Sequence, residues 1–549
     1  MASNPQRNFV QPFGKSEDRY KTDWRMLNWF GSTLWLILHL SYYGTTSLQN
    51  TTCPPGCQCF SSTTVICSDP TMILMPTNMS VQVKELIVMT TSLMDLRSTT
   101  LHYSPDLTKL VFLNNLLRHV SNMTFVRLTG LEELEISGNH WLDKLDPGTF
   151  SNQKNLTGLI LNFNKFKSLK NGLFNSLQKL KTLQLKGNSI SHLPGQLFQN
   201  LTSLCTLDLS LNNLTRVDGE LFGSLSQLKS LSLGYNLINI LLPNTFQNIS
   251  KVKNICLEGN LISHLPCGLF LHLKELEVLN LRGNVITNVS SGTFPSSLQK
   301  LDLKDNRMAT IQSVSFGGLT NLSHLFLSNN QLTDLPEAVF QNLGALQHLD
   351  LSANQLISLP GSIFQGLFSL EFVHLQSNNL SNLDATLFKD QTFLEQLYLS
   401  DNNLQTLPQG FLNTTVQENI LRLDRNPWHC DCHMLYLHDY VVQHSHLVED
   451  LSKVYCLGPR SLSGQNLVSV EREQLVCPSN ISLIASADPF NCSVDESPRP
   501  GKCSVHVIDD HVTIKCKWSE VLSMSVNVLF EEEDGTTSEY ILKKDRSDS

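Results

Sequence analysis

Leucine recurs along most of this chain at fixed positions. The template L-x-x-L-x-L-x-x-N-x-L returns about every 24 residues, as in Leu204–Leu214 and Leu346–Leu356. The alternation in its first half predicts a short strand whose second and third leucines point inward, while the residues between them face outward. Equal spacing predicts that strands from consecutive repeats lie side by side in one parallel sheet.

Two other residues mark the repeats. Asparagine follows the strand at positions 115, 139, 164, 188, 212, 236, 260, 284, 306, 330, 354, 378, 402 and 426, and an earlier, degenerate repeat with Thr91 in that place makes fifteen units. Phenylalanine stands at 125, 150, 174, 198, 222, 246, 270, 294, 316, 340, 364, 388 and 411. The asparagine side chain can both donate to and accept from buried backbone groups at each turn. We interpret the phenylalanines as a buried spine on the convex side.

The pattern predicts an α/β solenoid, a leucine-rich-repeat horseshoe with a parallel concave β-sheet over residues 76–426. No repeat can bury its own leucines, so both ends need caps. Cysteine clusters mark these caps at 47–75, with Cys53, Cys57, Cys59 and Cys67, and at 427–478, with Cys430, Cys432, Cys456 and Cys477. Alternating apolar and polar residues in 479–549 predict a small β-rich C-terminal appendage.

The first apolar stretch predicts entry into the secretory pathway. Residues 26–46 have the pattern of a signal peptide, which makes 1–25 a gene-model extension; a signal anchor is the alternative. The 14 cysteines favour an oxidising compartment. We therefore expect a secreted, extracellular protein without a stable membrane anchor. Glycosylation is predicted at thirteen Asn-x-Ser/Thr sequons, all placed away from the concave face: Asn50, Asn78, Asn122, Asn155, Asn200, Asn213, Asn248, Asn288, Asn321, Asn379, Asn413, Asn480 and Asn491.

The residues give no support for catalysis. Two His-x-x-Glu pairs, His272 with Glu275 and His446 with Glu449, have a zinc-binding spacing but lie in a repeat and in a cap. The common hydrolase and phosphate-loop motifs are missing from the sequence. The net charge of −9 and the lack of a long basic run argue against nucleic acid as the main partner. We predict a non-enzyme without cofactor or metal, although Cys-x-Cys also permits a metal-binding interpretation.

The outward strand positions locate a candidate binding surface. In the middle repeats they are small or polar, but towards the C-terminal end they become His324, Phe326, His348, Asp350, Phe372, His374 and Tyr398. Aromatic side chains beside histidines are typical of the centre of a protein interface. A mixed-charge band precedes them, with Arg282, Lys300, Asp302 and Lys304. Cys205, Cys256 and Cys267 are expected to be buried or free thiols, and the pairing of Cys492, Cys503 and Cys516 stays open.

The cap motifs CPPGCQCF at Cys53 and NPWHCDCHMLYL from Asn426 resemble the flanking modules of extracellular leucine-rich-repeat proteins. With LTKLVFLNNLL from Leu107, LNFNKF from Leu161 and REQLVCP ending at Pro478, the chain resembles the non-catalytic leucine-rich-repeat subunits of plasma zinc carboxypeptidases. This resemblance implies Cys430–Cys456 and Cys432–Cys477 disulfides and pairing among the N-terminal four. It also implies a hetero-oligomer with a zinc carboxypeptidase catalytic subunit. The alternative is an extracellular recognition receptor or carrier subunit for another ligand.

Overall fold

The computed structural model describes residues 53–77, 79–97, 101, 106–412 and 419–477, and the backbone of four strands between 502 and 544. The chain divides into two compact units, residues 1–478 and 479–549. The expected signal peptide and the extension before it lie outside the described residues, as do the sequons Asn50, Asn78, Asn413, Asn480 and Asn491.

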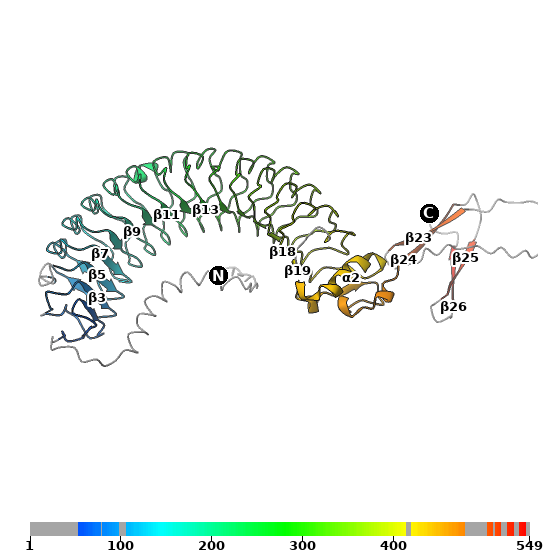
Figure 1. The fold of residues 1–549 in the computed structure, drawn as a ribbon, viewed down its shortest axis with the longest axis horizontal. Helices are drawn as coiled ribbons and strands as arrows, with labels where there is room; N and C mark the ends of the chain where they lie inside the picture. The colour runs from blue at the N-terminus through cyan, green and yellow to red at the C-terminus, as the bar shows by residue number, and fades with distance from the viewer. Residues whose placement is uncertain are drawn as a thin grey trace, which may run out of the picture. The chain divides into compact units, whose positions relative to one another are not determined.

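An 18-stranded sheet runs through the first unit and lines the inner side of its arc (Figure 1). One short strand comes from each repeat and pairs in parallel with the next, which confirms the predicted leucine-rich-repeat fold. The strands are β1 (Cys57–Cys59), β2 (Thr64–Cys67), β3 (Glu85–Met89), β5 (Lys109–Leu113), β7 (Glu133–Ser137), β8 (Gly158–Ile160), β9 (Thr182–Gln184), β10 (Thr206–Asp208), β11 (Ser230–Ser232), β12 (Asn254–Cys256), β13 (Val278–Asn280), β14 (Lys300–Asp302), β15 (His324–Phe326), β16 (His348–Asp350), β17 (Phe372–His374), β18 (Gln396–Tyr398), β19 (Ile420–Arg422) and β21 (Val448–Glu449).

The asparagines form a continuous ladder inside the solenoid. Asn402, 5% exposed, donates from Nδ2 to the carbonyl of Leu375 in the preceding repeat at 3.0 Å and to that of Leu399 in its own repeat at 3.1 Å. Its Oδ1 accepts the backbone N–H of Leu380 at 3.1 Å. One amide thus satisfies buried donors and acceptors of two repeats, which leucine could not do.

The phenylalanines stack behind the sheet. Neighbouring rings such as Phe150 and Phe174 have centroids 6.3 Å apart and planes within 8°, and both are buried. In the described residues the outer side of the repeats is built mainly of turns, with a small sheet of β4 (Asp95–Leu96) and β6 (His119–Val120) and one short 3-10 helix, Gly219–Phe222. The α-helix that the structure describes in the first unit lies in its C-terminal cap.

Disulfide-bonded caps close both ends. At the N-terminus β1 and β2 form an antiparallel hairpin held by Cys53–Cys59 and Cys57–Cys67, and β2 continues the sheet beside β3. At the C-terminus the pairs Cys430–Cys456 and Cys432–Cys477 confirm the implied connectivity. This cap contains β20 (Trp428–His429), β22 (Cys456–Gly458), helix α2 (Leu435–Gln443) and the 3-10 helices Cys432–Met434, Ser445–Leu447, Leu451–Lys453, Leu467–Ser469 and Arg472–Gln474.

Trp428 anchors the C-terminal cap to the last repeat. Its ring is fully buried, and its indole N–H donates to the carbonyl of Leu423 at 3.0 Å. Helix α2 buries Leu437 and Val441 against the same core. The cap therefore covers the apolar end that an unfinished solenoid would expose to water.

The second unit contains two antiparallel strand pairs. They are β23 (Lys502–Ile508) with β24 (His511–Lys517), and β25 (Met524–Glu531) with β26 (Thr537–Lys544). The register places Cys503 opposite Cys516. The predicted β-rich character of this part of the chain agrees with these strands.

The described sequons lie off the strands, and all are exposed except half-buried Asn200: Asn122, Asn155, Asn200, Asn213, Asn248, Asn288, Asn321 and Asn379. Cys205 and Cys256 are half-buried free thiols and Cys267 is an exposed one. Within the described chain, no helix has the length and apolar character needed to cross a membrane.

Candidate protein-binding surface

Four consecutive strands bring the seven candidate residues together on the concave face. In the parallel register His324 of β15 lies beside His348 of β16, which lies beside Phe372 of β17. A second row runs Phe326, Asp350, His374 and Tyr398. We call these seven side chains the concave patch. Their role in binding a partner stays a prediction.

His348 is the centre of the concave patch. Its ring centroid lies 4.9 Å from that of Phe326, 5.0 Å from that of His374 and 5.5 Å from that of Phe372. Its Nε2 atom is buried and has no hydrogen-bond partner in the described structure. Further along, His374 and Tyr398 stack with centroids 4.7 Å apart. The rings therefore form one contiguous surface, in which most members stay half-exposed.

Phe326 and Asp350 depart from the expectation that all seven residues are exposed. Phe326 is 9% exposed and Asp350 is 4% exposed. The reason is Lys304, whose Nζ passes 4.7 Å from the Phe326 ring centroid and reaches Asp350 Oδ2 at 2.7 Å. Lys300 Nζ also lies 5.1 Å from the same centroid. The mixed-charge band is thus joined to the concave patch through cation–π contacts.

Arg422 of β19 ends the concave patch on the other side and was not among the predicted residues. Its guanidinium lies 5.6 Å from the Tyr398 ring centroid and donates to Asp450 at 2.8 Å. The repeat pattern could have identified Arg422, because it has the same outward position in its repeat as Tyr398 has in the previous one. Cations therefore border the aromatic surface at both ends.

Burial controls the charge of the central groups. Desolvation, with His374 nearby, lowers the pKa of His348 to about 4. Desolvation and Lys300 also lower the pKa of His324. Desolvation opposes ionisation of Asp350, but the charge and hydrogen bond of Lys304 hold its pKa below the ordinary value. At neutral pH the middle of the surface is therefore an uncharged His348 beside a neutralised Lys304–Asp350 pair.

The depressed pKa of His348 predicts a pH-dependent stability. In the unfolded chain an ordinary histidine takes up its proton near pH 6.5, whereas the folded protein resists it until about pH 4. The unfolded state therefore binds more protons between these values, so stability falls as pH decreases through this window. Thermal unfolding is measured at pH 7 and at pH 4.5. The decrease in stability between these two pH values should be smaller in His348→Gln than in the wild type. Replacing exposed His192 with Gln should leave the wild-type pH response, and an equal response in all three proteins would contradict the assignment.

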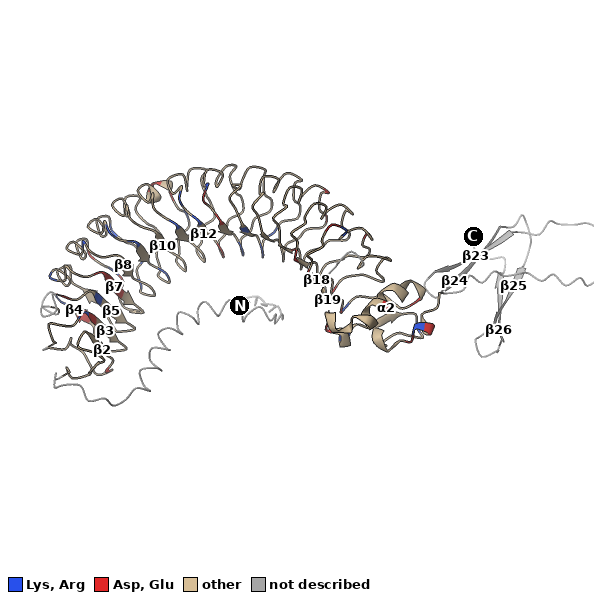
Figure 2. Ribbon diagram, in the orientation of Figure 1, with Lys and Arg blue, Asp and Glu red and all other residues tan. Residues whose placement is uncertain are grey.

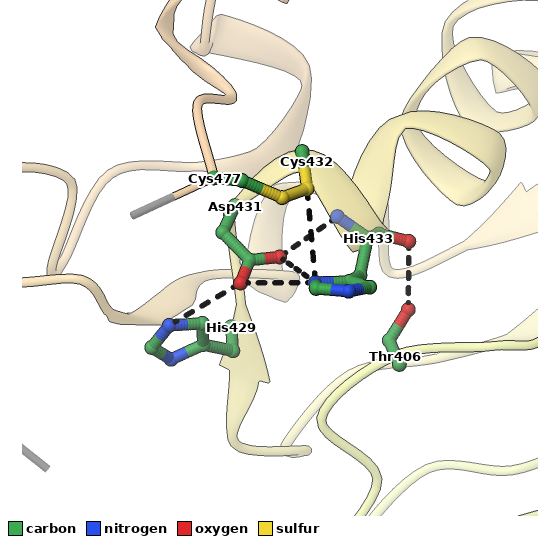
Figure 3. Close-up of a disulfide and its surroundings, with 6 residues drawn as sticks. All are labelled: Thr406, His429, Asp431, Cys432, His433 and Cys477. Atoms are coloured by element: carbon green, nitrogen blue, oxygen red, sulfur yellow. Dashed lines mark hydrogen bonds and ion pairs between the residues drawn. A yellow bond between two sulfur atoms is a disulfide. The ribbon is translucent and has the colours of Figure 1, made fainter. Parts of the chain in front are cut away.

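The C-terminal cap supplies the candidate metal site. The possible ligand atoms of Cys432, His433 and Cys477 lie within 4.8 Å of one another, a grouping that includes only the second cysteine of Cys-x-Cys. Figure 3 shows, however, that the two sulfurs are bonded to each other. Asp431 accepts the backbone N–H of His433 at 2.8 Å and lies 3.8 Å from His429 Nε2. Disulfide sulfurs are not thiolate ligands, so the arrangement favours a structural cap over a metal site.

The two His-x-x-Glu pairs remain isolated. His272 is half-buried on a repeat turn, and His446 and Glu449 are exposed in the cap. In the described part of the chain neither pair comes together with a third metal-binding side chain.

Comparison with known proteins agrees with this architecture. Residues 154–214, 203–262 and 296–356 match the family model "Leucine rich repeat", and 393–414 match a second model of the same description. Together with the ladder, sheet and caps, these matches define a leucine-rich-repeat solenoid. Within that class the chain is similar to carboxypeptidase N subunit 2.

Two relatives carry this similarity. Human carboxypeptidase N subunit 2 is 38% identical over 102 residues, which are 18% of this chain and 17% of the relative. The mouse protein is 36% identical over 73 residues, 13% of each chain. The similarity thus spans less than a fifth of the length of these relatives.

Solved structures share the fold. A leucine-rich-repeat protein of Leptospira interrogans superposes with a TM-score of 0.53 at 25% identity, over 61% of this chain and 89% of that one. A chain of the Drosophila Toll–Spatzle complex gives a TM-score of 0.52 at 21% identity, over 72% and 64%. The second match shows the fold alone.

Proposed function

We propose that this chain is a secreted, glycosylated, non-catalytic subunit that binds and stabilises a partner protein through the concave patch. The main support for this binding role is the contiguous surface of aromatic and histidine side chains across β15–β18. Aromatic anchors with a desolvated centre and a charged rim are typical of the energetic core of protein interfaces. Elsewhere on the same sheet, β10 and β11 present small or polar side chains.

The partner proposed is the catalytic subunit of a plasma zinc carboxypeptidase. The support is the similarity to carboxypeptidase N subunit 2, whose name identifies it as one subunit of a carboxypeptidase. The described sequons also leave the concave strands free, so predicted glycans would not cover the patch. The proposal assigns this chain the binding role, and places zinc and peptide hydrolysis on the partner.

Binding of purified chain to the catalytic subunit of carboxypeptidase N tests this assignment. We expect a stable complex in size-exclusion chromatography, with all peptidase activity and zinc coming from the partner. The chain expressed alone should have neither. Activity and zinc in the isolated chain would contradict the non-catalytic role.

Failure to form a complex would instead reject the carboxypeptidase partner. In that case the better interpretation of the concave patch is the alternative function, that of a recognition receptor or carrier subunit for another ligand.

A further inference from the structure

The repeats from β8 to β12 carry a strong local charge that the whole chain does not. Residues 150–256 contain eleven Lys and Arg against three Asp and Glu, in a protein of net charge −9. Figure 2 shows blue segments recurring along this stretch. Such a local excess attracts anions even where the net charge is negative.

The lysines gather on one flank, where the chain enters the strands. Lys181, Lys229 and Lys253 each directly precede a strand, and backbone hydrogen bonds link their positions through Cys205 in consecutive repeats. From Lys181 to Lys253 is three strand spacings of ~4.8 Å, or about 14 Å. Lys179 and Lys251 stand two residues earlier on the same flank. We call these five residues the lysine row.

Two side chains of the lysine row reach across to the repeat before them. Lys179 Nζ donates to Asn155 Oδ1 at 2.9 Å, and Lys251 Nζ donates to Gln227 Oε1 at 3.1 Å, so each reaches across to the preceding repeat. Exposed Lys154 lies next to Asn155, the residue that aligns with Lys179 one repeat earlier.

The lysines of this row are mostly without counter-ions. Within the row, Lys253 is the exception, because its Nζ pairs with Glu277 of the next repeat at 2.6 Å. Lys179, Lys181, Lys229 and Lys251 are exposed, and the described structure gives them no ion pair. The flank positions between β8 and β12 hold no Asp or Glu that could provide one.

We infer that the lysine row binds a linear sulfated polysaccharide. Ammonium groups that recur along one edge, interrupted only at the repeat of Cys205, match a polymer that carries anionic groups along its length. The apolar residues between these lysines, Leu180, Leu204, Leu228 and Val252, are fully buried and cannot insert into a bilayer. The row also offers no aromatic side chain on which nucleic-acid bases could stack. This surface is separate from the concave patch, so the inference does not depend on the proposed function.

Affinity for a heparin-derived octasaccharide, measured at 50 and 200 mM salt, tests the inference. Replacing Lys179, Lys181, Lys229 and Lys251 together with Gln should weaken binding at least 30-fold and reduce its salt dependence, because fewer counterions are released. The control replaces Lys144, Lys165, Lys167 and Lys170, which follow ladder asparagines, with Gln. It removes the same charge and should change affinity less than threefold.

Three results would overturn the inference: no octasaccharide binding by the wild type at 50 mM salt, equal loss in both quadruple variants, or tighter binding of single-stranded DNA or phosphatidylserine vesicles. Thermal unfolding should change little in either variant, because all eight side chains are exposed and the contacts that are lost, such as Lys179–Asn155 and Lys170–Asp146, lie at the surface. Both should also bind the carboxypeptidase subunit like the wild type, which separates this surface from the concave patch.

Discussion

Replacing Asn402 with alanine is expected to lower the free energy of unfolding by about 3 kcal/mol. The change removes the donors to the Leu375 and Leu399 carbonyls and the acceptor of the Leu380 N–H. These backbone groups are buried, so water cannot replace the lost amide without opening the repeat. Denaturant unfolding followed by circular dichroism measures the effect.

The neighbouring residue provides a matched control. Asn403 has an exposed side chain, and only its backbone N–H bonds to the preceding repeat. Asn403→Ala should therefore change stability by less than about 0.5 kcal/mol. Equal effects of the two substitutions would contradict the role assigned to the ladder.

Replacing Phe372 and Tyr398 together with alanine is expected to weaken partner binding about 100-fold, or about 3 kcal/mol. Both rings are half-exposed and contact the central histidines, Phe372 with His348 and Tyr398 with His374. They can contribute contact area to a partner while the fold retains its core. Phe326 is a poorer test, because it is 9% exposed beneath Lys304 and its loss would disturb packing.

Binding kinetics measured on immobilised catalytic subunit give the affinity of this double variant. Ser230→Ala with Ser232→Ala, at the outward positions of β11, makes the matched control on the same sheet and should bind like the wild type. Thermal unfolding verifies that all proteins are folded. Unchanged affinity of the Phe372 and Tyr398 variant would remove the concave patch from the interface.

The repeat pattern predicts most of the fold because each structural position has its own chemistry. The alternation of apolar and polar residues predicts which side chains face outward from the sheet. A recurring asparagine such as Asn402 marks the turn that follows each strand. The same register places His348 beside Phe372 before any coordinates are known. The disulfide pairing of the C-terminal cap was predicted from its resemblance to known flanking modules, because the spacing of the cysteines alone allows several pairings.

Side-chain reach explains what the sequence could not predict. Lys304 contacts Asp350 two strands away, and this covers Phe326 in the strand between them. Alignment of the repeats shows which residues point outward from the sheet. It does not show which long side chain extends over a residue of the neighbouring strand. The lysine row was hidden for a related reason, because Lys181, Lys229 and Lys253 are far apart in sequence and the net charge averages over the acidic remainder.

A glycan placed on the concave face tests whether the concave patch binds the partner. Gln396→Asn with Tyr398→Thr creates a sequon on β18 within the concave patch, and Ser230→Asn creates one on β11 outside it. With glycan occupancy verified by mass spectrometry, affinity for the carboxypeptidase N catalytic subunit is then compared with that of the same variant produced without N-glycosylation, because Tyr398→Thr alone removes a residue of the concave patch. The β18 glycan should abolish binding, whereas the β11 glycan should change the affinity less than threefold. Binding retained with the β18 glycan in place would contradict a binding role of the concave patch.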